Sequence, residues 1–150
     1  MTLYLIIIIA AIAFDQISKY LAVVFLKPIG TFPIIKNALH LTYSENTGAA
    51  FSILRGKQLF LIGITILAML FMLGYLYKWS QVDGQYWQKV CFALIIGGGI
   101  GNLIDRVRIG YVVDFIDFRL INFAIFNGAD SFIVVGVIAL ATLMIFKPQW

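Results

Sequence analysis

Apolar residues are concentrated in four long stretches, and polar residues lie mostly between them. The stretches cover residues 3–26, 58–77, 89–104 and 127–146. A helix needs about 20 mainly apolar residues to cross the roughly 30 Å hydrocarbon core of a bilayer. Each stretch is close to that length, so the pattern predicts four transmembrane helices.

The third stretch is the shortest and contains Gly97, Gly98, Gly99 and Gly101. Glycine weakens a helix by about 1 kcal/mol relative to alanine. In membranes, however, small residues four positions apart allow two helices to approach closely. The spacing of Gly97 and Gly101 therefore predicts close packing of this helix against a neighbour.

Two polar segments, 27–57 and 105–126, hold nearly all of the remaining chemistry. With four spans, they share one side of the membrane and both termini share the other. Segment 34–44 has the partial alternation of a half-buried strand, and Asn46-Thr47-Gly48 indicates a turn after it. We expect an all-α membrane protein, a single domain over residues 1–150, with four transmembrane helices and a small β-strand platform on the membrane surface.

The composition of the chain also indicates an integral membrane protein. Of its 150 residues, 12% are charged, whereas soluble domains carry about 25%. The Lys and Arg residues are scattered, so the net charge of +4 gives no sign of nucleic-acid binding. Cys91 and His40 are the only residues of their types, which excludes an internal disulfide and a zinc site with several such ligands. The sequence predicts no metal and no cofactor.

Basic residues are unevenly divided between the two predicted sides. The side with the termini holds Lys78, Lys89 and Lys147. The other side holds the larger set, which comprises Lys27, Lys36, Arg55, Lys57, Arg106, Arg108 and Arg119. The positive-inside rule would place the polar segments in the cytoplasm. Charges that serve a site or contact lipid head groups weaken the rule, so the charge count leaves the orientation open.

Asp15 and Lys19 lie four residues apart within the first stretch. This spacing puts the carboxylate and the ammonium on one helix face. Two interpretations follow. The pair either holds the helix bundle together or braces a functional site near the end of the helix.

A second group of polar residues follows the third stretch. Asn102 and Arg106 share a helix face, and Asp105 lies beside them. Arg106 either binds a lipid phosphate, pairs with Asp105, or belongs to a helix-end cluster that reaches water. In the other polar segment, the Asn46 amide is suited to hydrogen-bonding an extended peptide, because small residues follow it.

Asp114 and Asp130 are the strongest candidates for catalysis. Each lies in a short polar island at the margin of an apolar stretch. An ionised group near hydrocarbon is costly, up to roughly 2.5–3.5 kcal/mol at the bilayer centre. Two carboxylates within about 4–6 Å share a proton, and one can activate water while the other donates the proton. Asn127 faces the same side as Asp130.

In the alternative reading, Asp114 and Asp130 cap separate elements and do not meet. Asp117, independently of that question, is interpreted as a solvated loop charge.

In size, four-span layout and motif order, the chain resembles the bacterial lipoprotein signal peptidases, or signal peptidase II. Five motifs carry the resemblance: Asp-Gln-Ile-Ser-Lys at 15–19, Asn-Thr-Gly-Ala-Ala-Phe at 46–51, Gly-Asn-Leu-Ile-Asp-Arg at 101–106, Val-Val-Asp-Phe at 112–115 and Phe-Asn-Gly-Ala-Asp-Ser at 126–131. Each motif alone is weak, but the ordered set is specific.

The resemblance implies an intramembrane aspartic endopeptidase that cuts prolipoprotein signal peptides just before the diacylglyceryl-modified cysteine. Asp114 and Asp130 match the catalytic pair of the family. The family positions that line the substrate cleft correspond to Asn46, Asn102, Arg106 and Asn127 in this sequence. The polar positions that support the cleft correspond to Asp15, Lys19 and Asp105.

The resemblance also implies a location and partners. We expect a bacterial cytoplasmic (inner) membrane protein, with cytoplasmic termini and an extracytoplasmic strand platform and active site. The expected partners are lipid-modified prolipoproteins, membrane lipid and globomycin-type inhibitors, and we expect a monomer. Gly128 and Gly99 depart mildly from the family pattern, in which larger residues are usual.

Two rival functions predict different sequence features. A small proton-coupled transporter or channel subunit would place carboxylates deep within its spans and would show an inverted repeat. The aspartates lie at span margins instead, and no repeat is visible. A non-catalytic scaffold would leave the clustered Asn, Asp and Arg residues unexplained.

Overall fold

The computed structural model describes residues 1–49, 53–121 and 123–146. In this part of the chain it contains four long helices, which are α1 (Thr2–Leu21), α2 (Gln58–Trp79), α3 (Tyr86–Ile109) and α4 (Gly128–Phe146). A π-helical turn, η1 (Ala22–Leu26), continues α1. All four helices are long and apolar enough to cross a membrane. The chain is therefore a multi-pass membrane protein.

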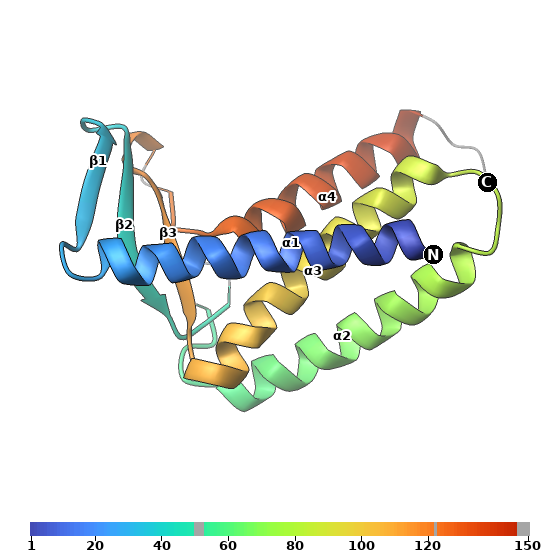
Figure 1. Cartoon of the computed structure of the whole chain (residues 1–150), viewed down its shortest axis with the longest axis horizontal. Coiled ribbons are helices and arrows are strands. Elements are labelled where there is room, and N and C mark those ends of the chain that lie inside the picture. Colours follow the sequence, from blue (N-terminus) through green and yellow to red (C-terminus); the bar gives the residue numbers. More distant parts are fainter. Residues whose placement is uncertain (50–52, 122, 147–150) are drawn as a thin grey trace.

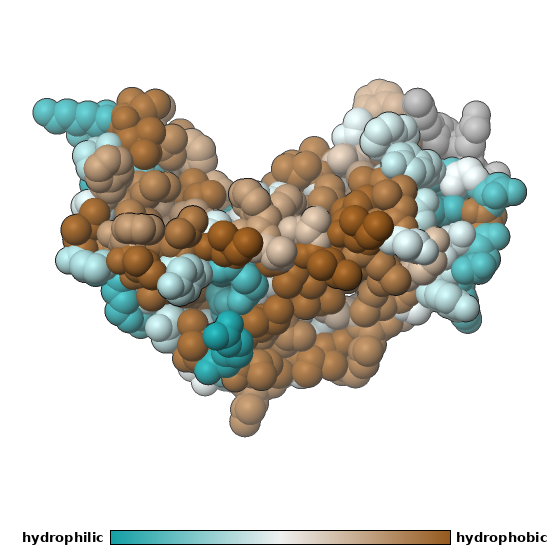
Figure 2. Space-filling view, in the orientation of Figure 1, coloured by the Kyte–Doolittle hydropathy of each residue, from teal (hydrophilic) through white to brown (hydrophobic). Residues whose placement is uncertain are grey.

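Helix α3 is the centre of the bundle and contacts each of the other three (Figure 1). Half of its apolar segment is buried inside the molecule, against 17% for α2 and 11% for α4. Apolar side chains cover the helical part of the surface, and hydrophilic residues gather toward its two ends (Figure 2). Such an outer surface needs lipid rather than water around it.

The glycines of α3 allow this central position. A Cβ on Gly97 would lie 2.7 Å from the Ala11 side chain of α1, and one on Gly101 would lie 2.6 Å from Asp15 Oδ2. A Cβ on Gly98 would meet a backbone carbonyl of α4. The close packing predicted from the glycine spacing is confirmed.

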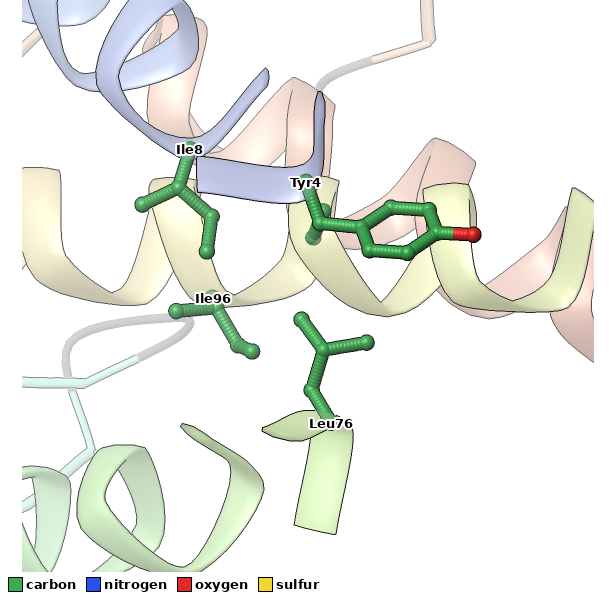
Figure 3. Packing of buried hydrophobic residues seen from close by; sticks show 5 residues of the cluster. Tyr4, Ile8, Leu76 and Ile96 are labelled. Carbon is green, nitrogen blue, oxygen red and sulfur yellow. The ribbon is translucent and has the colours of Figure 1, made fainter. Parts of the chain in front are cut away.

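An apolar core holds the bundle together near the end where the N-terminus of the chain lies. Tyr4 and Ile8 from α1 meet Leu76 from α2 and Ile96 from α3 (Figure 3). Leu76 and Ile96 have no exposed surface. This core fixes α1, α2 and α3 together far from the polar residues of the other end.

A three-stranded antiparallel sheet lies at the opposite end of the bundle (Figure 1). Its order is β1 (Thr31–Ile35), β2 (Leu39–Asn46) and β3 (Val112–Phe118). A short 3₁₀ turn, η3 (Arg119–Ile121), follows β3. The sheet is fixed to the bundle because Ala22 and Leu26 of η1 pack with Val113.

Two details of the predicted platform were wrong. Segment 34–44 is not one strand, because the chain reverses at 36–38 between β1 and β2. Asn37 adopts a left-handed conformation with φ of 61°, which asparagine tolerates better than most residues. The segment 105–126 is not simply a loop either, since α3 continues to Ile109 and β3 follows.

Asp117 was also misread as a solvated loop charge. It lies in β3 and is 8% exposed. Its Oδ2 accepts a hydrogen bond from Thr42 at 2.7 Å and pairs with Arg119 at 2.9 Å. The sequence pattern does not reveal this burial, because it depends on strand pairing and on a hydrogen bond from Thr42 of the neighbouring strand.

Candidate active site

Asp114 is presented by β3 at the edge of the helix bundle. Gly110 ends α3 in a left-handed conformation with φ of 80°, and the chain then turns into β3. The Asp114 side chain is held by two amides. Its Oδ1 accepts from Asn127 Nδ2 at 2.6 Å, and its Oδ2 accepts from Asn46 Nδ2 at 3.1 Å. With 2% exposure, this carboxylate depends on those donors.

Asp130 lies in the first turn of α4, where Asn127 caps the helix. The N–H of Asp130 donates to Asn127 Oδ1 at 3.0 Å, and the N–H of Asn127 donates to Asp130 Oδ2 at 3.3 Å. This reciprocal pair is a capping box, and an acid in the first turn also suits the helix dipole. The remaining oxygen, Oδ1, accepts from Asn102 Nδ2 at 2.8 Å.

Two asparagines connect the two aspartates. Asn127 Nδ2 donates both to Asp114 and, at 3.2 Å, to Asn102 Oδ1. Asn102 in turn donates to Asp130. Asp130 does cap α4, but the two carboxylates, although they lie on different elements, belong to one hydrogen-bond network.

The surroundings of Asp114 favour its protonated form. Burial raises the pKa of Asp114 to about 7, the negative charge of Asp130 acts in the same direction, and the hydrogen bonds from Asn127 and Asn46 oppose them. A carboxyl with a pKa near neutrality can hold or release a proton at physiological pH.

The ion pair predicted from the spacing of Asp15 and Lys19 is present. Lys19 Nζ lies 2.8 Å from Asp15 Oδ2 and 3.0 Å from Asp105 Oδ2. It also donates to Asn102 Oδ1 at 2.9 Å. All four side chains are buried, so this cluster continues the network of the aspartates into the bundle.

The two acids of this cluster also accept backbone hydrogen bonds. The N–H of Ala129 donates to Asp15 Oδ1 at 2.8 Å, and the N–H of Val113 donates to Asp105 Oδ2 at 3.2 Å. Gln16, which the sequence did not single out as a site residue, donates to Asp105 Oδ1 at 3.0 Å. Its place beside Asp15 in the first motif was the available signal.

Arg106 contacts carbonyl groups. Its Nη2 donates to the Gly48 carbonyl at 2.9 Å, and its Nη1 donates to the Asn102 carbonyl at 3.4 Å. Its Nε is buried and has no hydrogen-bond partner among the described atoms. The ionic partner found for Asp105 is Lys19, not Arg106.

The turn after β2 adjoins this site. Asn46 Oδ1 accepts from the N–H of Gly48 at 2.9 Å, which orients its amide nitrogen toward Asp114. Ala50 and Phe51, the last two residues of the second motif, lie outside the described residues. Within the described ranges, no group of three His, Cys, Asp or Glu residues could hold a metal ion.

Gly128 opens α4 between these polar residues and α1. A Cβ at this position would lie 3.4 Å from Phe14 Cε1, which is an ordinary contact. The structure therefore has room for the alanine-sized side chain that Gly128 lacks.

A membrane-spanning bundle with two aspartates connected through asparagine side chains at one end is the arrangement expected of a membrane aspartic peptidase. Comparison with known proteins specifies the family. The family model described as Signal peptidase (SPase) II matches residues 7–146. The chain belongs to the signal peptidase II family.

Similar proteins agree with this assignment. The lipoprotein signal peptidase of Caldanaerobacter subterraneus subsp. tengcongensis is 52% identical over 95% of this chain and 96% of its own length. The lipoprotein signal peptidase of Clostridioides difficile is 45% identical over 96% and 95%. A solved structure described as a bacterial membrane enzyme superposes with a TM-score of 0.87 at 36% identity, covering 99% of this chain and 91% of that one.

Proposed function

We propose that this chain removes signal peptides from diacylglyceryl-modified prolipoproteins by cutting on the N-terminal side of the lipid-modified cysteine. Family membership and the names of its relatives support this activity. The observation that carries the proposal is the shared network of Asp114 and Asp130, which Asn127 and Asn102 connect.

Asp114 and Asp130 act as the catalytic pair. One carboxylate accepts a proton from a water molecule while that water attacks the scissile carbonyl, and the other carboxyl protonates the carbonyl oxygen. When the tetrahedral intermediate breaks down, the C–N bond cleaves and the leaving nitrogen takes up a proton from the pair. The products are the free signal peptide and a lipoprotein with a new amino terminus at its modified cysteine.

Two polar residues are well situated to contact the substrate peptide. Asn46 presents its amide beside Asp114, and Arg106 places a cation with an unpartnered Nε in the same region. Asn102 and Asn127 are more deeply buried, so we assign them to the floor of the substrate cleft, where they orient the carboxylates.

We place the chain in the bacterial cytoplasmic membrane as one domain, with cytoplasmic termini and an extracytoplasmic active site. Three of the basic residues at the sheet end have local partners that account for their presence there. Lys27 pairs with Glu45 at 3.1 Å, Arg119 pairs with Asp117, and Arg106 is engaged by the site.

The substrate enters from the lipid, and its acyl chains remain in the bilayer. We propose that the chain acts as a monomer, because both aspartates and their contacts come from a single copy.

A cyclic peptide inhibitor of the globomycin type should occupy the same cleft. The transporter alternative is not supported, since the aspartates lie at the end of the bundle and the reported relatives are peptidases.

A cleavage assay with a purified lipidated precursor tests the function. We expect a single product whose new amino terminus is the lipid-modified cysteine, identified by mass spectrometry, and loss of that product with globomycin. The matched control is the same precursor without its diacylglyceryl group, which should remain intact. Cleavage at another bond, or equal cleavage of both precursors, would contradict the proposal.

A further inference from the structure

Two backbone N–H groups beside the catalytic pair are held by carboxylates from other helices. The N–H of the residue immediately before Asp130 donates to Asp15 of α1 at 2.8 Å. The N–H of the residue immediately before Asp114 donates to Asp105 of α3 at 3.2 Å. Each catalytic aspartate is therefore adjacent in sequence to a backbone group that a separate buried acid fixes.

Lys19 connects these two attachments. Its ammonium lies 2.8 Å from Asp15 Oδ2 and 3.0 Å from Asp105 Oδ2. It also donates at 2.9 Å to Asn102, whose amide contacts Asp130. The Lys19 side chain is 4% exposed, and those of Asp15 and Asp105 are 0% and 7% exposed. Water therefore has little access to screen these interactions.

We propose that Lys19 is a positioning residue that fixes the relative placement of Asp114 and Asp130 by joining Asp15 and Asp105. This inference rests on the proposed function, because it assumes that the two aspartates act together. Lys19 itself lies outside the reaction. Lys19 acts indirectly, by holding Asp15, which fixes the start of α4, and Asp105, which fixes β3.

The physical argument rests on the charges of the cluster. Without Lys19, two buried carboxylates would face each other with no cation between them, and both would be costly to keep ionised. They would separate, take up protons, or draw in water. Either acid would then hold its backbone N–H less firmly, and the catalytic aspartates would lose their fixed geometry.

A purely structural role for Lys19 predicts a different result. If Lys19 only holds the bundle together, its loss lowers the stability of the protein, while molecules that remain folded keep the wild-type kcat. A positioning role predicts a lower kcat in the folded molecules, with KM nearly unchanged. The pH profile separates the two roles further.

The charged groups facing Asp114 are Lys19 of α1, Arg106 of α3 and Asp130 of α4. Its partners on β2 are neutral, because Ser44 is paired with it in register and Asn46 donates a hydrogen bond to it. The positive charge of Lys19 partly offsets the effects of burial and of Asp130, which together raise the pKa of Asp114. Removing Lys19 therefore raises the pKa of Asp114 further, and the alkaline limb of the rate profile, where the pair loses its shared proton, should move to higher pH.

The test compares Lys19→Met with Lys89→Met in the cleavage of a lipidated precursor. Lys89 is the matched control, because it is also a helical lysine with 3% exposure, yet its ammonium binds the carbonyl groups of Val82 and Gly84 in the loop between α2 and α3. We expect Lys19→Met to lower kcat about 100-fold, the size of effect caused by misplacing reacting groups by about 1 Å. Lys89→Met should keep the wild-type kcat and pH profile.

Asp15→Asn provides a second route if Lys19→Met fails to fold. The side-chain amide oxygen of this variant can still accept the hydrogen bond from the Ala129 N–H of α4. The side chain is neutral, however, so it no longer forms an ion pair with Lys19. We expect a lower kcat with little change in KM. Wild-type kcat and pH profile in folded Lys19→Met, or wild-type kcat in Asp15→Asn, would overturn the inference.

Asp114→Asn is measured alongside these variants to separate the two proposals. If Asp114→Asn cleaves at the wild-type rate, the catalytic pair itself is wrong. If Asp114→Asn is inactive while Lys19→Met is unaffected, only the positioning role of Lys19 fails.

Discussion

The Asp114 carboxyl is almost fully buried and lies near a second acid. Burial is the larger effect, and with the charge of Asp130 it raises the pKa of Asp114 to about 7 in the folded chain. An unfolded aspartate has a pKa of about 3.9, and each unit of difference is worth about 1.4 kcal/mol. The fold thus gives up stability at neutral pH to keep a carboxyl that titrates near neutrality.

Replacing this carboxyl should stabilise the protein in a pH-dependent way. The stability that Asp114 contributes is fully present below pH ~4 and is lost as pH rises through its folded pKa of about 7. Asp114→Asn removes the cost of ionising the buried group, so its Tm relative to wild type should be higher at pH 8 than at pH 5. Thermal unfolding in detergent at both pH values measures the difference.

Asp117 of the same strand is the control for this prediction. Burial acts to raise its pKa, but hydrogen bonds from Arg119 and Thr42 outweigh burial and lower the pKa of Asp117 overall. Asp117→Asn should therefore lower Tm at pH 8, opposite in sign to Asp114→Asn. The same pH dependence for both variants would contradict the assignment.

At the scale of elements, α3 determines where the site forms. Its glycines bring α1 and α4 close to its axis, and its C-terminal turns supply Asn102, Asp105 and Arg106. Gly101 contacts the polar network most closely, because Asp15 Oδ2 occupies the space that a Cβ at this position would need. Helix packing and the polar network therefore depend on the same residue.

Gly101→Ala should damage the site, whereas Gly74→Ala should not. The new Cβ at position 101 would lie 2.6 Å from Asp15 Oδ2, and Asp15 is fully buried and held by Lys19. We expect a loss of Tm and of cleavage activity. Gly74 lies on α2 with nothing within 4 Å of its Cβ position, so alanine should gain roughly 1 kcal/mol of helix preference. Equal effects of both variants on activity would contradict this account of packing.

The sequence predicted the helices more readily than the sheet. Long apolar stretches identify membrane helices because lipid requires about 20 such residues. Strand β3 was missed because Asp114 and Asp117 interrupt its apolar pattern, and those acids are buried only through partners from distant segments. The turn at Asn37 was missed because a single left-handed residue reverses the chain without glycine or proline.

The candidate site was predictable at the level of residues but not of contacts. The motifs made Asp114 and Asp130 the candidates for catalysis, and helical spacing predicted the ion pair of Asp15 and Lys19, which the structure contains. Spacing could not show that Lys19 also binds Asp105, because that contact depends on how α1 packs on α3.

At the scale of the whole molecule, the sheet lies at one end of the bundle and the N-terminus lies at the other (Figure 1). Asp114 belongs to β3 of that sheet, and Asp130 joins the same hydrogen-bond network. The exposed apolar surface between the two ends suits a bilayer (Figure 2). This polarity is what allows a peptidase to work at one membrane surface while its substrate remains anchored by lipid. The proposed orientation assigns the sheet end to the extracytoplasmic side.

Cysteine labelling in intact cells tests this orientation. In a Cys91→Ala background, a cysteine in place of Lys36 at the hairpin turn should react with a membrane-impermeant maleimide from outside. A cysteine in place of Ser80, in the turn after α2, should react only after the membrane is opened. The reverse pattern would invert the topology and remove the proposed site from the side where the substrates are processed.

The most direct test of the central claim is a comparison of single and double substitutions in the catalytic pair. Asp114→Asn, Asp130→Asn and the double variant are assayed for kcat on a lipidated precursor, with Asp117→Asn as the control from the same strand. If the two carboxylates work as one unit, each single variant should lose about 10³-fold or more in kcat, and the double variant should fall no further. Substantial turnover by either single variant, or losses that simply multiply in the double variant, would contradict the account.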